Sequence, residues 1–262
     1  MPFDNAVERD PNYLGVFLFS FKKTSLAFAL PLLIAGSTAV GALADAAPAA
    51  AANGTINIYS GAVYEGANFT QVSASWKVPT TATCSSTEDS TAYIWVGLGG
   101  LSGADNDKLE QIGTAQWCRD GQKHYGLFAE FFPDGPIAGD GYEYPDYPVA
   151  AGDNVTATVT KADDDDFTIT ETNHTQNWTF SRTGHSQTQG GGTGQGTAEV
   201  VAEDPGGSLS NFGSVSFSGI SASASDVSNP SYQLKDMKDG SGPTKATATS
   251  TSSGVKVTWQ HI

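Results

Sequence analysis

The fold of this chain is decided by stretches such as Ala198-Glu199-Val200-Val201-Ala202-Glu203-Asp204-Pro205, in which acidic and apolar side chains alternate. Successive side chains of a β-strand point to opposite faces, so this stretch is predicted to be a strand with Val200 and Ala202 on one face. Glu199 and Glu203 then share the opposite face. Two acids on a strand otherwise suited to a core indicate either a functional site or an edge strand that faces solvent.

The same alternation recurs between short clusters of Ser, Thr, Gly, Asn and Asp, and no stretch of the expected mature chain has a convincing helical period. The chain is therefore predicted to be all-β, folded as an antiparallel β-sandwich. We expect Asp163–Asp166 to cap a hairpin as a solvated turn, with bound calcium as the alternative, and Gly190–Gly196 to be a flexible loop. Further strands are expected at Gln71–Val78, Leu109–Gly113, Asn154–Thr160, Phe167–Thr172, Ser214–Ile220 and Gly254–Ile262.

The first fifty residues differ in composition from the rest. Lys22-Lys23 precede the apolar stretch 26–35, and Ala42-Leu43-Ala44 offers small residues for cleavage, a pattern typical of a secretory signal peptide. A second apolar patch over 13–21 makes an uncleaved membrane anchor the alternative. We expect a signal peptide over 1–44, an Ala/Pro linker over 45–56 and a single secreted, monomeric domain over 57–262, with membrane contact only if the leader is retained.

Two cysteines, Cys84 and Cys118, fall in the part of the chain that is expected to be exported. An even number of cysteines in an oxidising compartment favours a disulfide. Cys84 and Cys118 are therefore predicted to pair, with two free buried thiols as the alternative.

The formal net charge of −15, with 13 Lys and Arg residues and no basic stripe, argues against nucleic-acid binding. Charged residues make up 16% of the chain, which is less than the roughly 25% of an ordinary soluble domain. At low pH the carboxylates become neutral and few cations remain, so self-repulsion is limited. The composition permits tolerance of acid.

Familiar hydrolase motifs are missing from the sequence: it contains neither a Gly-x-Ser-x-Gly elbow nor a His-Glu-x-x-His helix, and no metal or cofactor is expected. Carboxylates and amides are left as candidate chemical groups. Glu130 alternates with Phe128 and Phe132, and burial among aromatic rings would raise its pKa, although a half-buried structural acid is the alternative. Trp95, in Tyr93–Gly100, belongs either to the core or to a cleft where glycines let a ligand approach the backbone.

Taken in order, several segments between Ser60 and Phe217 resemble the glutamic peptidases, the eqolisin family. The resemblance implies two bent antiparallel sheets in a lectin/glucanase-like sandwich, a substrate cleft across one face, and acid endopeptidase activity that pepstatin does not inhibit. The matching segments are Gly61-Ala62-Val63, Val72–Pro79, Trp95-Val96-Gly97, Glu110–Gly113, Glu130 with Phe131–Asp134, and Ala198-Glu199 with Glu203-Asp204.

On this sequence the resemblance implies that Gln111 and Glu203 are the catalytic residues and that Trp95 and Glu130 line the substrate cleft. An ionised Glu203 would activate a bound water as general base and then pass the proton to the leaving amine. Gln111 would orient that water and donate its amide N–H to the developing oxyanion. Glu199 is expected to be a strand acid or a supporting partner.

The chain departs from the family pattern at Gly99, where an Asp is usual, and at Phe131-Phe132, which replace Trp-Tyr. These changes are expected to alter the hydrogen bonding of the cleft, the pH optimum and the substrate preference. The sequence thus predicts a secreted endopeptidase that acts on polypeptides. Two other classes stay open, a carbohydrate-binding or adhesive sandwich by analogy with lectins, and a glycosidase with Glu130 and Glu203 as its carboxyl pair.

Overall fold

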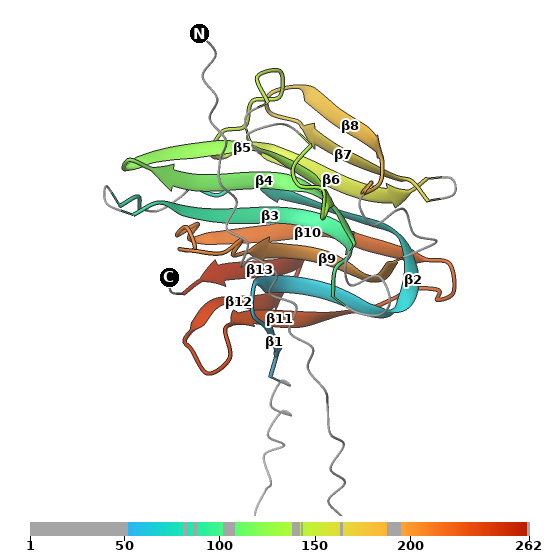
Figure 1. The fold of residues 1–262 in the computed structure, drawn as a ribbon. Coiled ribbons are helices and arrows are strands. Elements are labelled where there is room, and N and C mark those ends of the chain that lie inside the picture. Colours follow the sequence, from blue (N-terminus) through green and yellow to red (C-terminus); the bar gives the residue numbers. More distant parts are fainter. Residues whose placement is uncertain are drawn as a thin grey trace, which may run out of the picture. The chain divides into compact units, whose positions relative to one another are not determined.

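The computed structural model describes residues 52–80, 83–85, 88–101, 108–137, 142, 144–162, 165–187 and 195–260. All the regular secondary structure in these ranges is β-strand, which confirms the all-β expectation (Figure 1). The expected signal peptide over 1–44, the linker as far as residue 51, and residues 190–194 of the glycine-rich loop lie outside the described residues. No helix able to cross a membrane occurs in the described part of the chain.

The strands lie in chain order and are separated by turns and loops. They are β1 (Gly54–Ile56), β2 (Tyr59–Lys77), β3 (Ser90–Gly99), β4 (Leu109–Arg119), β5 (Gln122–Phe132), β6 (Asn154–Lys161), β7 (Phe167–Asn173), β8 (Trp178–Gly184), β9 (Gln195–Glu203), β10 (Ser214–Ala224), β11 (Tyr232–Lys238), β12 (Thr244–Thr251) and β13 (Gly254–Trp259). Each strand expected from the sequence lies within or overlaps one of these. Gly54–Ile56, expected at the end of the linker, pairs in parallel with β11.

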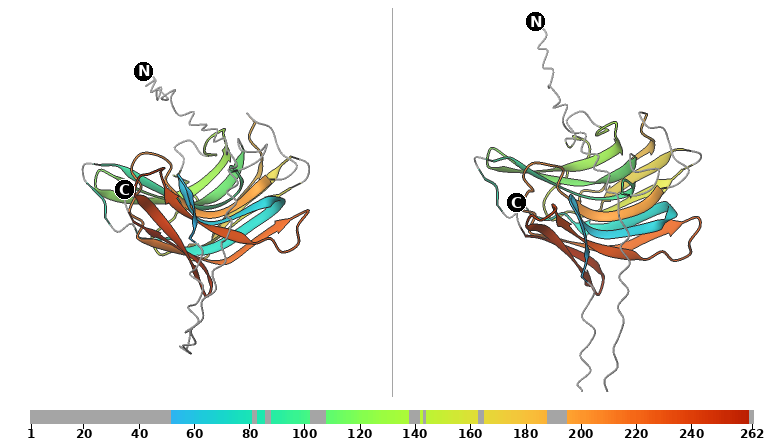
Figure 2. Two further views of the ribbon diagram at one scale, coloured as in Figure 1. Left: turned by 90° about the horizontal axis from the view of Figure 1, so that it is seen from below. Right: turned by 60° about the horizontal axis from the view of Figure 1, so that its bottom comes forward.

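The long strand β2 is the branch point of the fold. Its first half pairs with β9 and β11, whereas its second half pairs with β6 and β10 (Figures 1 and 2). The register on β9 shifts between Glu65 and Phe69, where Gly66 has a φ of 83°, a conformation that favours glycine. Instead of two separate sheets, the structure has one hydrogen-bonded network in which β2 joins two sets of strands.

The main apolar core collects alternate residues from both sets. Val200 and Ala202 of β9 are fully buried in it, as the alternation of that strand predicts. Strands β3, β4 and β9 also bury their opposite face, because a second apolar cluster lies there. Its members are Tyr59, Val63, Trp95, Leu109, Ala115, Trp117, Phe128 and Val201. The predicted inward residues of β2 and the residue after it, Val72, Ala74, Trp76 and Val78, are all buried.

The predicted disulfide between Cys84 and Cys118 is confirmed. It links the segment before β3 to the end of β4, with Cα atoms 5.4 Å apart and a sequence separation of 34 residues. Closing a loop of this length removes conformational freedom from the unfolded chain and stabilises the fold by about 3–4 kcal/mol. The disulfide therefore secures two neighbouring strands of the set that contains Trp95 and Gln111.

Replacing both cysteines with serine is expected to lower the free energy of unfolding by about 3–4 kcal/mol, because the unfolded chain regains the freedom of the open loop. Urea denaturation of the mature domain measures this difference. Reduction of the wild-type protein with a thiol should produce the same loss. A double variant as stable as the oxidised wild type would contradict the prediction.

Candidate active site

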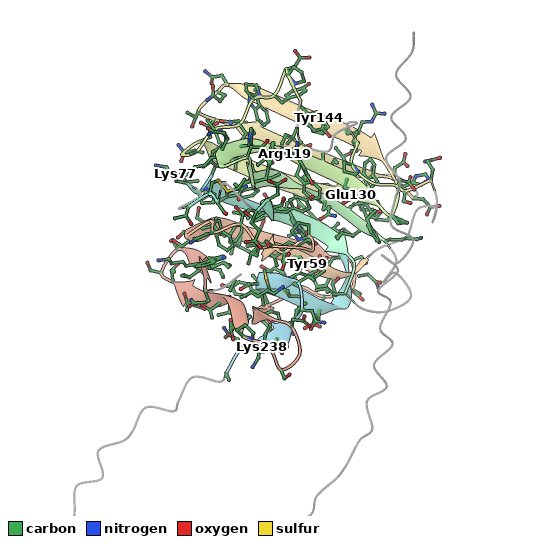
Figure 3. The ribbon with its side chains drawn as sticks, turned by 60° about the vertical axis from the view of Figure 1, so that its left-hand side comes forward. Tyr59, Lys77, Arg119, Glu130, Tyr144 and Lys238 are labelled. Atoms are coloured by element: carbon green, nitrogen blue, oxygen red, sulfur yellow. A yellow bond between two sulfur atoms is a disulfide. The ribbon has the colours of Figure 1, made fainter. Side chains whose placement is uncertain are left out.

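The residues that the sequence singled out lie on one face of β3, β4, β5 and β9. Gln111 is opposite Glu130 of β5 and Gly97 of β3, and Gly97 is opposite Glu199 of β9. Residues two positions apart on a strand share a face, so Trp95 and Glu203 also lie on this side. The structure therefore gathers Gln111, Glu203, Trp95 and Glu130 on a common surface, and in Figure 3 Glu130 and Tyr59 lie on its two flanks.

Trp95 holds the carboxyl group of Glu203. Its indole Nε1 donates a hydrogen bond of 2.7 Å to Glu203 Oε2. Its side chain is fully buried and packs edge-on against Tyr59, with ring centroids 5.1 Å apart. A Cβ at Gly97 would lie 2.7 Å from the indole, and one at Gly113 would lie 2.6 Å from the Trp95 Cα. Gly97 therefore leaves room for the ring, and Gly113 lets β4 lie close to the backbone of β3.

Gln111 is held by Glu130 in a similar way. Its Nε2 donates a hydrogen bond of 2.8 Å to Glu130 Oε2, and its side chain is only 3% exposed. Among the described residues, no group hydrogen-bonds to the buried Oε1 of Gln111. Buried polar atoms are nearly always satisfied, so this oxygen is suited to accept a hydrogen bond from a water molecule or a substrate group. Glu130 and Glu203 are half-buried as whole residues, in contrast to the fully buried Trp95.

Burial makes the neutral form of both carboxyl groups the preferred one. Desolvation raises the pKa of Glu203 to about 8, the Trp95 hydrogen bond lowers it, and the charge of Glu130 raises it further. Desolvation also raises the pKa of Glu130 to about 7, against a smaller lowering by the Gln111 hydrogen bond. This rise favours a protonated Glu203 in acid, whereas the sequence led us to expect an ionised one.

Two further glutamates are fully buried. Glu199 lies on the same face as Glu203, and burial raises its pKa well above the usual value. Glu171 lies on β7, and burial raises its pKa to about 8. Among the described residues, no group hydrogen-bonds to the carboxyl oxygens of Glu171, whereas Thr197 opposes part of the rise in the pKa of Glu199. The sequence analysis did not single out Glu171, although its alternation with the buried Phe167 and Ile169 could have revealed it.

Aromatic residues around the site were also missed. Tyr93 stacks on Phe128 with centroids 4.2 Å apart, and its hydroxyl contacts that of Tyr142. Trp117 could have been found, because alternation along β4 places it on the same face as Gln111. Tyr142 lies outside the strands and gives no periodic signal.

The structure shows the surroundings of the residues that depart from the family pattern. Gly99 has a φ of 95°, which favours glycine over aspartate. Phe131 packs in the main core, whereas Phe132 is 43% exposed. Within the described ranges, no cluster of three or more His, Cys, Asp or Glu side chains could hold a metal ion.

A family model described as the peptidase A4 family matches residues 57–260. Among solved structures, scytalido-glutamic peptidase with a transition state analog inhibitor is similar, with 18% identity and a TM-score of 0.63 over 78% of this chain and 98% of that chain. SCP-B, a member of the eqolisin family in complex with the tripeptide Ala-Ile-His, gives 17% identity and a TM-score of 0.59 over the same shares.

Aspergilloglutamic peptidase from Aspergillus niger gives 23% identity and a TM-score of 0.52, over 65% of this chain and 99% of that chain. At these identities the solved structures establish a shared fold. A comparison with curated protein sequences gives no significant match.

The buried glutamates predict a fold that is most stable in acid. A carboxyl group whose pKa is raised by folding binds a proton that the unfolded chain has already lost, so the stabilisation is complete below the unfolded pKa and is lost as pH rises through the folded pKa. For Glu171 this window extends from about pH 4.5 to about 8.

In wild type, the free energy of unfolding should fall as pH rises through this window, because Glu171 holds a proton in the folded state that it has lost in the unfolded chain. Glu171→Gln cannot bind this proton, so the slope should become less steep by about 1.4 kcal/mol per pH unit. Denaturant unfolding at a series of pH values measures the slope. Glu88→Gln, which changes an exposed acid, is the matched control and should leave the slope unchanged. Equal slopes in wild type and Glu171→Gln would show that Glu171 titrates normally.

Proposed function

This chain belongs to the peptidase A4 family and is a glutamic endopeptidase, and from this premise we propose that Gln111 and Glu203 are its catalytic residues. Trp95 and Glu130 support the two catalytic side chains, and the half-buried Glu130 also borders the bound polypeptide. The observation that carries the proposal is the pair of contacts on one face of the sheet, in which Glu130 holds Gln111 and Trp95 holds Glu203.

The raised pKa of Glu203 decides how this residue takes part in the reaction. Because Trp95 donates to Oε2, the proton of the neutral carboxyl group resides on Oε1. Oε1 can then donate its proton to the carbonyl oxygen of the scissile bond, while Oε2 accepts a proton from the attacking water. Glu203 therefore activates water as a base and the substrate carbonyl as an acid.

The same carboxyl group completes the reaction. Water adds to the carbonyl carbon, and Gln111 stabilises the charge that develops on the carbonyl oxygen by donating from its Nε2. The neutral tetrahedral intermediate then collapses. Glu203 donates a proton to the leaving nitrogen and takes one from a hydroxyl of the intermediate, which yields an acid, an amine and a neutral Glu203.

The finer architecture follows from the same proposal. The strands β2, β9, β3, β4 and β5 form one layer of a bent sandwich, and the substrate crosses the face that carries Gln111. Residues 1–44 direct the enzyme out of the cell, where it acts on extracellular polypeptides. The low proportion of charged residues, 16%, suits such a protein to acidic surroundings.

Variants of the two catalytic residues provide the direct test of function. Gln111→Ala is expected to lower kcat on a denatured protein at about pH 4 roughly 100- to 1,000-fold, or about 3–4 kcal/mol, because one oxyanion donor is lost. Glu203→Gln should lose at least as much activity, since the amide has no acidic proton to transfer. Glu88→Gln serves as the control at an exposed acid. If all the variants retained wild-type activity, the assignment would be wrong.

The pH dependence of kcat/KM tests the protonated form of Glu203. Activity is expected to be high in acid and to fall above about pH 7 to 8, as Glu130 and then Glu203 lose their protons. Trp95→Phe removes the hydrogen bond that lowers the pKa of Glu203, so the fall should move to higher pH. A rise in kcat/KM through the same pH range would instead identify the ionised carboxylate as the active form.

A further inference from the structure

The proposed chemistry leaves a neighbouring hollow without a role. It has a volume of about 250 Å³, lies beside the ends of β4 and β5, and is bounded mainly by aromatic and proline side chains. Its walls include Trp117, His124, Tyr142, Tyr144, Tyr147 and Pro148. We call this hollow the aromatic pocket.

Close packing fixes the floor of the aromatic pocket. Trp117 is only 5% exposed and stacks on His124, with centroids 5.3 Å apart and planes 14° apart. Tyr142 packs against the same indole at 5.1 Å. A Cβ at Gly126 would lie 2.1 Å from the carbonyl oxygen of Tyr142, so the glycine permits the backbone of residue 142 to lie directly against β5.

Strand pairing and one side-chain contact connect the aromatic pocket to the candidate active site. Tyr142 contacts the hydroxyl of Tyr93, and Tyr93 is opposite Glu203 in the pairing of β3 with β9. On the other side of β3, Tyr93 pairs with Ala115 of β4, and Ala115 pairs with Gly126 of β5, which lines the pocket. A single row of paired residues therefore runs from the catalytic strand β9 to the wall of the pocket on β5.

The length of this row indicates how many substrate residues separate the scissile bond from the aromatic pocket. Adjacent strands are about 4.8 Å apart, so the three steps from β9 to β5 cover roughly 14 Å. An extended peptide advances about 3.3–3.6 Å per residue. A substrate that crosses the strands would thus reach the aromatic pocket about four residues from its scissile bond.

The lining indicates the class of side chain that binds. Aromatic rings favour other aromatic rings in stacked or edge-to-face contact, and the volume suits one large side chain. Burial raises the pKa of Tyr142; the hydrogen bond with Tyr93 and the cation Arg119 oppose that rise, whereas the carboxyl groups of Glu130 and Glu203 add to it. Figure 3 labels Arg119 and Tyr144 in this part of the molecule.

We propose that the aromatic pocket is a substrate subsite that accepts a Phe, Tyr or Trp side chain about four residues from the scissile bond. This inference rests on the proposed peptidase function. Binding energy gained at such a distance helps to hold the peptide across Gln111 and Glu203.

Quenched fluorescent peptides, in which one aromatic residue is moved along an otherwise fixed sequence, test the subsite. With wild-type enzyme, an aromatic residue about four positions from the cleaved bond should raise kcat/KM roughly 10- to 200-fold over alanine there. His124→Trp fills the pocket and should abolish this preference, so that kcat/KM no longer differs between the aromatic and the alanine peptides. His174→Ala, at an exposed histidine that hydrogen-bonds Thr156, is the control and should keep the preference. An unchanged preference in His124→Trp would overturn the proposal.

A binding measurement separates this inference from the function on which it rests. Glu203→Gln enzyme is titrated calorimetrically with the aromatic and the alanine peptides, so the result does not require cleavage. Roughly tenfold tighter binding of the aromatic peptide, lost when His124→Trp is added, supports the subsite even if the wild type proves inactive. Equal binding of the two peptides contradicts it, whatever the activity of the wild type.

Discussion

The strands β3, β4 and β9 are buried on both faces, and this constraint decides what their polar side chains can do. One face of each strand packs in the main core, and the other supports the cluster around Trp95. A charge in such a place is costly unless it is paired and hydrogen-bonded. Gln111 and Glu203 are accordingly held by Glu130 and Trp95, and the carboxyl groups favour their neutral forms.

This neutrality links the fold to the chemistry. In the proposed mechanism, the burial that raises the pKa of Glu203 also gives it a proton to transfer in acid, and the hydrogen bond from Trp95 to Oε2 leaves Oε1 to carry that proton. The same effect at Glu171 of β7, which takes no part in the proposed chemistry, makes the fold itself favour acid. Stability and activity are therefore expected to share a pH range because they share a physical cause.

The alternation of apolar and polar residues predicts local features, such as which side chains of a strand share a face. It assigned the two faces of β9 correctly, including the burial of Val200 and Ala202, and the cysteine count predicted the disulfide. The double pairing of β2 escaped the sequence analysis, because strand partners come from distant segments. The protonation of Glu203 escaped for a related reason: its pKa depends on burial and on Glu130, which only the folded chain brings near. Tyr142, outside the strands, carried no periodic signal.

The central claim is that Gln111 and Glu203 act on the same peptide bond, and a crystal structure of Glu203→Gln with an uncleaved peptide tests it most directly. The account predicts a scissile carbonyl oxygen about 2.6–3.2 Å from Gln111 Nε2, with the side chain of residue 203 within hydrogen-bond reach of the same bond. A peptide bound on another surface, with Gln111 still engaged only with Glu130, would contradict it.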